Sequence, residues 1–295
     1  MLIMWSYVYV VITATLWSLN PAIIQKFGKN LKPMTITVFR AFAALALLIP
    51  LAFVNGIHSN FNLYAISVAV ASGIIGPGIG DTVYTRSIQL IGGSLAAIIS
   101  YTYIFVAQIL AFLILRESIE ISIVVGGILA FLGIVVALYD RDRGFSKTDL
   151  AGVLYTVITA ITWGIAATLI KLATVYLDPL TLAIIRLSSM SIALSIFMLI
   201  FEKPRIRREV KNIALISITT GILSWGVGLY LFHYSIALVG VSRTVIAIAL
   251  TPILSQAIVK LVTKERIGVR NIIGAILVAI GILISSIPSL VYRTT

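Results

Sequence analysis

Two short stretches of the sequence decide the fold: "VITATLW" at residues 11–17 and "VITAITW" at residues 157–163. They agree at five of seven positions and stand 146 residues apart in a chain of 295. At the same offset, Pro33 matches Pro179 and Arg40 matches Arg186. From residue 73 onward the offset becomes 148, and the matched pairs are Gly73/Gly221, Gly78/Gly226, Gly80/Gly228, Gly92/Gly240, Ser94/Ser242, Gln108/Gln256, Glu117/Glu265, Gly126/Gly274 and Gly133/Gly281.

This register indicates an internal repeat. It holds through tryptophan, glutamine, glutamate and arginine with a single slip of two residues, which chance similarity between apolar segments would not do. We therefore predict two copies of one unit, over residues 1–145 and 146–295.

The composition places these units in a membrane. The chain is 60% hydrophobic and 11% charged, against about 45–50% and about 25% in ordinary soluble domains. Long apolar runs such as "ITVFRAFAALALLIPLAFV" (36–54) recur along its length, and about 20 such residues cross the hydrocarbon core as a helix. The runs are continuous rather than alternating, which excludes a β-barrel. We predict an all-α, multi-pass protein of the cell membrane.

The apolar runs predict ten spans, five in each unit. Their approximate limits are residues 5–26, 33–54, 63–88, 93–114, 121–138, 150–171, 179–200, 212–236, 242–262 and 268–287. Five is an odd number, so the second unit enters the membrane from the opposite side to the first. The expected fold is a pair of inverted five-helix repeats, an arrangement found in many secondary transporters.

Several chemistries lack their signatures. The net charge of +12 comes mainly from basic residues between apolar runs, which favours membrane orientation over nucleic-acid binding. There is no cysteine and no "GxxxxGK[ST]" phosphate loop, and His58 and His233 stand apart from any acidic cluster. We expect no cofactor, no metal, no nucleic-acid partner and no enzymatic activity.

The order of the duplicated motifs resembles the drug/metabolite transporter superfamily, and specifically its EamA-type members. The likeness covers the whole chain: the paired tryptophans, the "P-x6-R" pairs, "LRES" with "TKER", and "GGILAFLG" with "GAILVAIG". It implies export of amino acids or other small metabolites, along a path between the halves lined by spans 1, 3, 4, 6, 8 and 9. It implies no particular substrate.

Asp81 lies in "GPGIGDTVYTR" (76–86) and is the one acidic residue inside a predicted span. Polar groups in a bilayer are costly and mark functional sites. Pro77 and three glycines predict a helix break here, and Tyr84 and Thr85 fall on the face of Asp81. One interpretation is a proton-coupling or amine-binding site. The alternative is a structural ion pair with Arg86, Arg40 or a lysine at a chain end.

Three arginines carry competing interpretations. Arg40 and Arg186 could anchor an anion, but their symmetric occurrence favours a structural guanidinium that snorkels to the interface or bonds free carbonyls. Arg243 opens span 9, and its match in the first unit is Leu95. A lone arginine at that place could hold a substrate carboxylate through two parallel bonds.

Side chains with an apolar body and a polar tip gather on the spans expected to line the path. They suit amphipathic substrates and cations, although for any single one packing or interfacial anchoring is the favoured explanation. The candidate binding residues are Trp17, Asn20, Asp81, Tyr84, Tyr101, Tyr103, Trp163, Trp225, Tyr230, His233, Arg243 and Thr251. Trp17 and Trp163 could form a shared gate or floor, and bends are expected at Asn20-Pro21 and Thr251-Pro252.

Two further patterns concern helix ends and orientation. Glu117 and Glu265 precede spans 5 and 10 and are expected to favour the positive ends of their dipoles. The linkers after spans 1, 3, 5, 7 and 9, counted with the span ends beside them, carry sixteen of the twenty-two basic residues. The positive-inside rule places them in the cytoplasm and both termini outside, whereas the resemblance implies cytoplasmic termini, so the orientation stays open.

The sequence thus predicts a secondary transporter that exports small metabolites, most simply amino acids or similar zwitterions, by alternating access. A proton gradient acting through Asp81, or downhill flow, would drive it. The alternatives are a carrier of phosphorylated or nucleotide sugars, which needs several converging cations, and an integral membrane enzyme or lipid scramblase. The choice between monomer and homodimer stays open.

Overall fold

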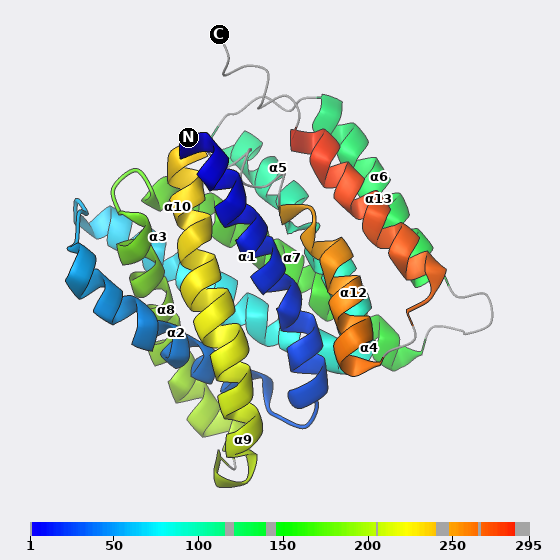
Figure 1. Ribbon diagram of the computed structural model, residues 1–295, viewed down its shortest axis with the longest axis horizontal. Helices are drawn as coiled ribbons and strands as arrows, with labels where there is room; N and C mark the ends of the chain where they lie inside the picture. The colour runs from blue at the N-terminus through cyan, green and yellow to red at the C-terminus, as the bar shows by residue number, and fades with distance from the viewer. Residues whose placement is uncertain are drawn as a thin grey trace.

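The computed structural model describes residues 2–115, 121–139, 146–204, 206–239, 248–264 and 267–286 of the chain. Its described elements are helices throughout (Figure 1). Glu117, Arg243 and Glu265, on which three of the predictions rest, lie outside the described residues.

The described residues of the first half form seven helical elements. They are α1 (Leu2–Phe27), α2 (Pro33–Asn55), α3 (Leu63–Gly73), the π-helix η1 (Ile74–Gly80), α4 (Asp81–Ser100), α5 (Tyr103–Leu115) and α6 (Ile121–Leu138). The second half contains α7 (Lys147–Ala173), α8 (Pro179–Phe197), the π-helix η2 (Met198–Glu202), α9 (Ile206–Ile216), the π-helix η3 (Ser217–Gly228), α10 (Leu229–Val239), α12 (Thr251–Thr263) and α13 (Val269–Ser286).

Local sequence explains where these helices begin. Pro33 and Pro179 open α2 and α8, where a missing N–H costs nothing because the first helical N–H groups have no partner within the helix. Ser146 and Asp149 form a capping box at the start of α7. Asn62 caps α3 by accepting a hydrogen bond of 2.7 Å from the N–H of Ala65.

The membrane character of the chain agrees with the prediction. Among the described residues, seven helical segments are long and apolar enough to span a bilayer: Val8–Phe27, Pro33–Asn55, Leu63–Ser100, Ile121–Leu138, Lys147–Ala173, Pro179–Glu202 and Ile206–Ser235. Three shorter apolar helices, Tyr103–Ile114, Thr251–Thr263 and Val269–Ser285, accompany them. The count of ten spans stays a prediction.

The helix break expected at "GPGIGD" is wrong in its form. Residues 74–80 continue the helix as a π-helix, whose wider turn accommodates Pro77 without ending the rod. The matching stretch of the second half, within η3, is also a π-helix. Both wide turns contribute residues to the cavity described below.

Real interruptions occur further along each unit. At Gly92 the backbone turns with φ of 82°, a conformation that glycine adopts without strain. A turn then separates α4 from α5 at Tyr101–Thr102, and a turn at the matching positions 249–250 precedes α12. The break expected near Thr251-Pro252 is therefore present, whereas α1 stays helical through Pro21.

Glycines bring the two halves into close contact. At Gly221 of η3, an added Cβ would lie 2.7 Å from the carbonyl oxygen of Arg40 in α2. At Gly73 of α3, an added Cβ would meet the carbonyl oxygen of Arg186 in α8. Because Gly73 matches Gly221 and Arg40 matches Arg186, the same contact is made twice, with the roles of the halves exchanged.

A second glycine contact joins α6 and α13, which lie side by side at one edge of the bundle (Figure 1). Gly126 faces Gly281, and Gly133 faces Gly274, with each glycine against the carbonyl oxygen of its partner. Small residues at the interface let these two helices approach each other closely.

Candidate functional site

A cavity of about 120 Å³ lies at the centre of the molecule. Both halves line it, through α1, η1, α4, the start of α5, α7, α8, η3 and α10. Six aromatic side chains form much of its wall: Trp17, Tyr101, Tyr103, Trp163, Trp225 and Phe232. An engineered apolar cavity of about 150 Å³ binds benzene, so a space of this order accepts a small ring.

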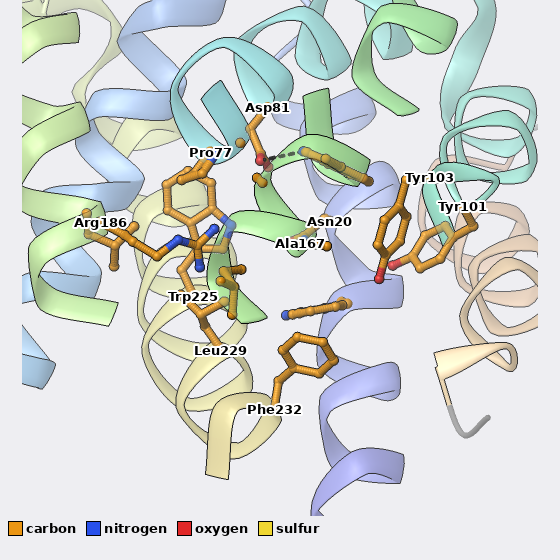
Figure 2. A pocket seen from close by; sticks show the side chains of 16 residues that line it. Asn20, Pro77, Asp81, Tyr101, Tyr103, Ala167, Arg186, Trp225, Leu229 and Phe232 are labelled. Atoms are coloured by element: carbon orange, nitrogen blue, oxygen red, sulfur yellow. Dashed lines mark hydrogen bonds between the residues drawn. The ribbon is translucent and has the colours of Figure 1, made fainter. Parts of the chain in front are cut away.

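Three polar side chains interrupt the aromatic wall: Asn20, Asp81 and Arg186. Figure 2 shows Arg186 entering from one side, Asp81 bonded to an indole nitrogen, and Tyr101 and Tyr103 across the cavity from Arg186. The cavity therefore presents one carboxylate and one guanidinium within an aromatic enclosure.

Asp81, at the first position of α4, is held by two donors. Its Oδ2 accepts a hydrogen bond of 3.0 Å from the indole N–H of Trp163, and its Oδ1 lies 3.4 Å from Nη1 of Arg40. The residue is 7% exposed. Of the ion-pair partners considered from sequence, Arg40 is the one observed, while Arg86 is exposed and lies 3.4 Å from Gln89 instead.

Arg40 reaches Asp81 from α2 and is fully buried. Its guanidinium carbon lies 4.0 Å from the centre of the Trp225 ring, a cation–π distance. Trp225 lines the cavity, and its ring lies between the cavity and the guanidinium of Arg40. The expectation that Arg40 snorkels to the interface is wrong, because the wide turn of η1 brings Asp81 to it inside the bundle.

Arg186, in α8, is 4% exposed and lines the cavity. Its Nη1 lies 3.3 Å from Nε2 of His233, and its Nε has no hydrogen-bond partner. An interfacial position is wrong for this residue too. Gly76 lies beside it: an added Cβ there would be in ordinary contact with Nη2 of Arg186, at 3.4 Å, and too close to Cβ of Ala166, at 2.6 Å.

The paired tryptophans Trp17 and Trp163 pack against matching glycines. An added Cβ on Gly80 would lie 2.7 Å from the Trp163 ring, and one on Gly228 would lie 3.1 Å from the Trp17 ring. Each tryptophan therefore packs on the third predicted span of the other half. Their indole N–H groups differ in partner, because Trp17 bonds the carbonyl oxygen of Ser224 at 3.0 Å.

The structure gathers many of the predicted binding residues at one place. Seven line the cavity: Trp17, Asn20, Asp81, Tyr101, Tyr103, Trp163 and Trp225. Tyr84 is buried behind Trp163, with ring centres 5.0 Å apart, and His233 is buried behind Arg186. Tyr230 is half-buried and stacks on Tyr234, and Thr251 is buried at the start of α12.

Sequence reasoning missed Arg186 as a lining residue, together with Phe232 and Leu229 of α10. The sequence did contain a signal for Arg186. Leu229 stands at the position that matches Asp81, so Arg186 has no equivalent of the carboxylate that pairs with Arg40. No group of three metal-binding side chains is found in the part of the chain that the structure describes.

These features define a multi-pass helical membrane protein with a central cavity shared by two related halves. The model of the EamA-like transporter family matches the chain in two segments, residues 4–139 and 150–287. The chain belongs to this family.

Relatives agree with this assignment. An uncharacterized transporter of Archaeoglobus fulgidus is 22% identical over 94% of this chain and 96% of its own. A second from the same organism is 26% identical over 95% and 98%. The uncharacterized transporter YoaV of Bacillus subtilis is 21% identical over 69% and 70%. A solved crystal structure aligns with this chain over 98% of the length of each, with a TM-score of 0.71 and 18% sequence identity. This is a likeness of fold alone.

Proposed function

We propose that this transporter exports small metabolites, amino acids or similar zwitterions, by alternating access between two inverted repeats. The observation that carries the proposal is the placement of Asp81 and Arg186 on one aromatic cavity between the halves. A zwitterion offers a carboxylate to a guanidinium, and an ammonium to a carboxylate or to aromatic faces. Its apolar part suits the aromatic walls.

Reciprocal contacts support the inverted arrangement. Glu202, at the end of η2, accepts hydrogen bonds of 2.8 Å from the N–H groups of Met34 and Thr35 at the start of α2. Beyond the other end of α2, Ser59 donates to the carboxylate of Asp178 at 2.5 Å, just before α8. The equivalent helices α2 and α8 therefore run antiparallel, as two repeats of opposite orientation require.

The wide turns suit a moving part. Two π-helices, η1 and η3, lie beside the cavity at related places, and π-turns are frequent at functional sites. One half can then close its side of the cavity while the opposite side of the cavity is open. Asp81 stays the candidate for proton coupling, with downhill flow as the alternative.

Transport by the purified protein tests this proposal. Liposomes would be loaded with amino acids, sugars and phosphorylated metabolites, and the protein-dependent loss of each would be measured by mass spectrometry with and without a pH gradient. Wild type would be compared with Asp81→Asn, and with Asp149→Asn at the exposed start of α7 as the matched control.

Selective loss of amino acids is expected from wild type and from Asp149→Asn. If a proton gradient drives export, Asp81→Asn abolishes the response to the gradient. If flow is downhill, the gradient has no effect on either protein. Loss of phosphorylated sugars alone, or no selective loss from vesicles that hold folded protein, contradicts the amino-acid proposal.

A further inference from the structure

Arg186 is a buried charge for which the described residues offer no counterion. None of their acidic side chains lies within 4.0 Å of its guanidinium. The side chain is 4% exposed, its Nε has no partner, and it borders the cavity. A buried ion without a partner is costly, so the cavity presents a cation that a ligand could neutralise.

His233 does not compensate this charge. Its Nδ1 lies 3.3 Å from the carbonyl oxygen of Pro179, which can only accept a hydrogen bond. With the proton on Nδ1, the ring offers Nε2 as the acceptor for Nη1 of Arg186, at 3.3 Å. The histidine facing Arg186 is therefore neutral, and it orients the guanidinium without adding a negative charge.

Asp81 is committed to other partners. Arg40 and the indole of Trp163 occupy its two oxygens, at 3.4 and 3.0 Å. Among the described residues, two buried guanidinium groups and one buried carboxylate thus lie at or next to the cavity, and one positive charge remains in excess. An amine entering the cavity meets a carboxylate already neutralised, whereas a carboxylate entering it meets a free cation.

We infer that Arg186 anchors the carboxylate of the transported solute, and that the cavity selects small apolar or aromatic carboxylates whether or not they bear an amine. The inference rests on the proposed function and redefines its substrate class by the carboxylate, with the amine not required. A guanidinium binds a carboxylate through parallel, charge-assisted bonds. The aromatic walls hold the apolar part of the solute.

Binding of three matched probes to the purified, detergent-solubilised protein tests the inference. Phenylalanine carries both charged groups, phenylpropanoate lacks the amine, and phenethylamine lacks the carboxylate. Calorimetric titration gives each Kd without interference from passive leak across vesicles. We expect phenylalanine and phenylpropanoate to bind within about tenfold of each other, and phenethylamine to bind at least about tenfold more weakly than either.

Variants locate the effect. Arg186→Gln should weaken both carboxylates by about 10- to 100-fold and leave phenethylamine unchanged, since hydrogen bonds to charged groups are the strong ones. Arg186→Lys, which keeps the charge but loses the planar fork, should give intermediate affinities. Arg86→Gln removes an exposed arginine from α4 and serves as the control for net charge.

Several results would overturn the inference. One is tighter binding of phenethylamine than of phenylpropanoate. Another is unchanged carboxylate affinity in both Arg186 variants while each remains monodisperse, and a third is no binding of any probe. The proposed function stands or falls separately, because efflux of amino acids from wild-type vesicles is measured without reference to these probes.

Discussion

The indole nitrogen of Trp163 lies 3.0 Å from a carboxylate oxygen of Asp81, and this bond breaks the internal symmetry of the molecule. Trp17, the matching tryptophan, bonds the backbone carbonyl of Ser224 at the same distance. Each ring packs against a glycine of the other half, Trp163 on Gly80 and Trp17 on Gly228, and both rings line the cavity. What differs is the charge of the acceptor, so the two tryptophans allow a matched comparison.

Trp163→Phe should destabilise the protein more than Trp17→Phe. Both changes remove a similar ring area, but the first removes a hydrogen bond to a charged group, worth about 1.5–3 kcal/mol, and the second a neutral bond, worth about 0.5–1.5 kcal/mol. Thermal unfolding midpoints in detergent measure the difference. Equal midpoints for the two variants would show that the Asp81 bond contributes no more than its counterpart.

Arg40→Met should cost about 3–5 kcal/mol, because it leaves the Asp81 carboxylate buried without its ion-pair partner. The double variant Arg40→Met with Asp81→Asn removes both charges and should recover a large part of this loss. Unfolding midpoints of the wild type, both single variants and the double variant form a double-mutant cycle. If the stability loss of the double variant equals the sum of the two single losses, Arg40 and Asp81 are not energetically coupled.

Much of this fold was readable from the duplicated residues. Trp17 and Trp163, and the glycines of α6 and α13, lie where a repeated unit would place them. The two arginines were misplaced because symmetry favoured one shared role for them. Asp81 has no copy, so Arg40 obtains a carboxylate and Arg186 obtains only a histidine.

Other features left little trace in the sequence. The turn at Tyr101–Thr102 contains neither glycine nor proline, so propensity gave no warning of it. The stretch around Pro77 carried breaker residues, yet the segment stayed helical by widening into a π-helix. Both outcomes depend on packing against the other half, which a local pattern does not contain.

Asp178 provides a prediction about pH. Partial burial alone would raise its pKa, but donors on Ser59, Thr181 and Leu180 outweigh this effect and hold the pKa below its ordinary value. Its stabilising contribution is therefore full above the unfolded pKa of about 3.9 and is lost as the pH falls through the folded pKa. Asp178→Asn, which keeps the capping oxygen, should flatten this acid loss.

The measurement for Asp178 is the thermal unfolding midpoint of both proteins between about pH 6 and about pH 3. We expect the wild type to lose stability faster than the variant over the lower part of this range. Parallel curves would show that Asp178 titrates with the same pKa in the folded and unfolded chain.

Neighbouring glycines in α6 offer a packing test with an internal control. Gly126 lies against the carbonyl oxygen of Gly281, whereas a Cβ on Gly127 would find Phe105 at 3.8 Å, an ordinary contact. Gly126→Ala should force α6 and α13 apart and cost about 1–3 kcal/mol. Gly127→Ala should leave the unfolding midpoint unchanged or raise it slightly, and equal losses would contradict the contact.

Accessibility of single cysteines tests the opposite orientation of the halves, and the chain is suited to it because it contains no native cysteine. Glu202 contacts the start of α2, so we expect Lys29→Cys and Lys203→Cys to be labelled from one side of the membrane. Ile57→Cys and Val175→Cys should be labelled from the other, since Ser59 contacts Asp178. An impermeant maleimide applied to intact cells and to inverted vesicles makes the distinction.

The excess of basic residues near positions 29 and 203 favours the cytoplasm for the first pair. Labelling of positions 29 and 175 from the same side would exclude inverted repeats, because both follow the first span of their own unit.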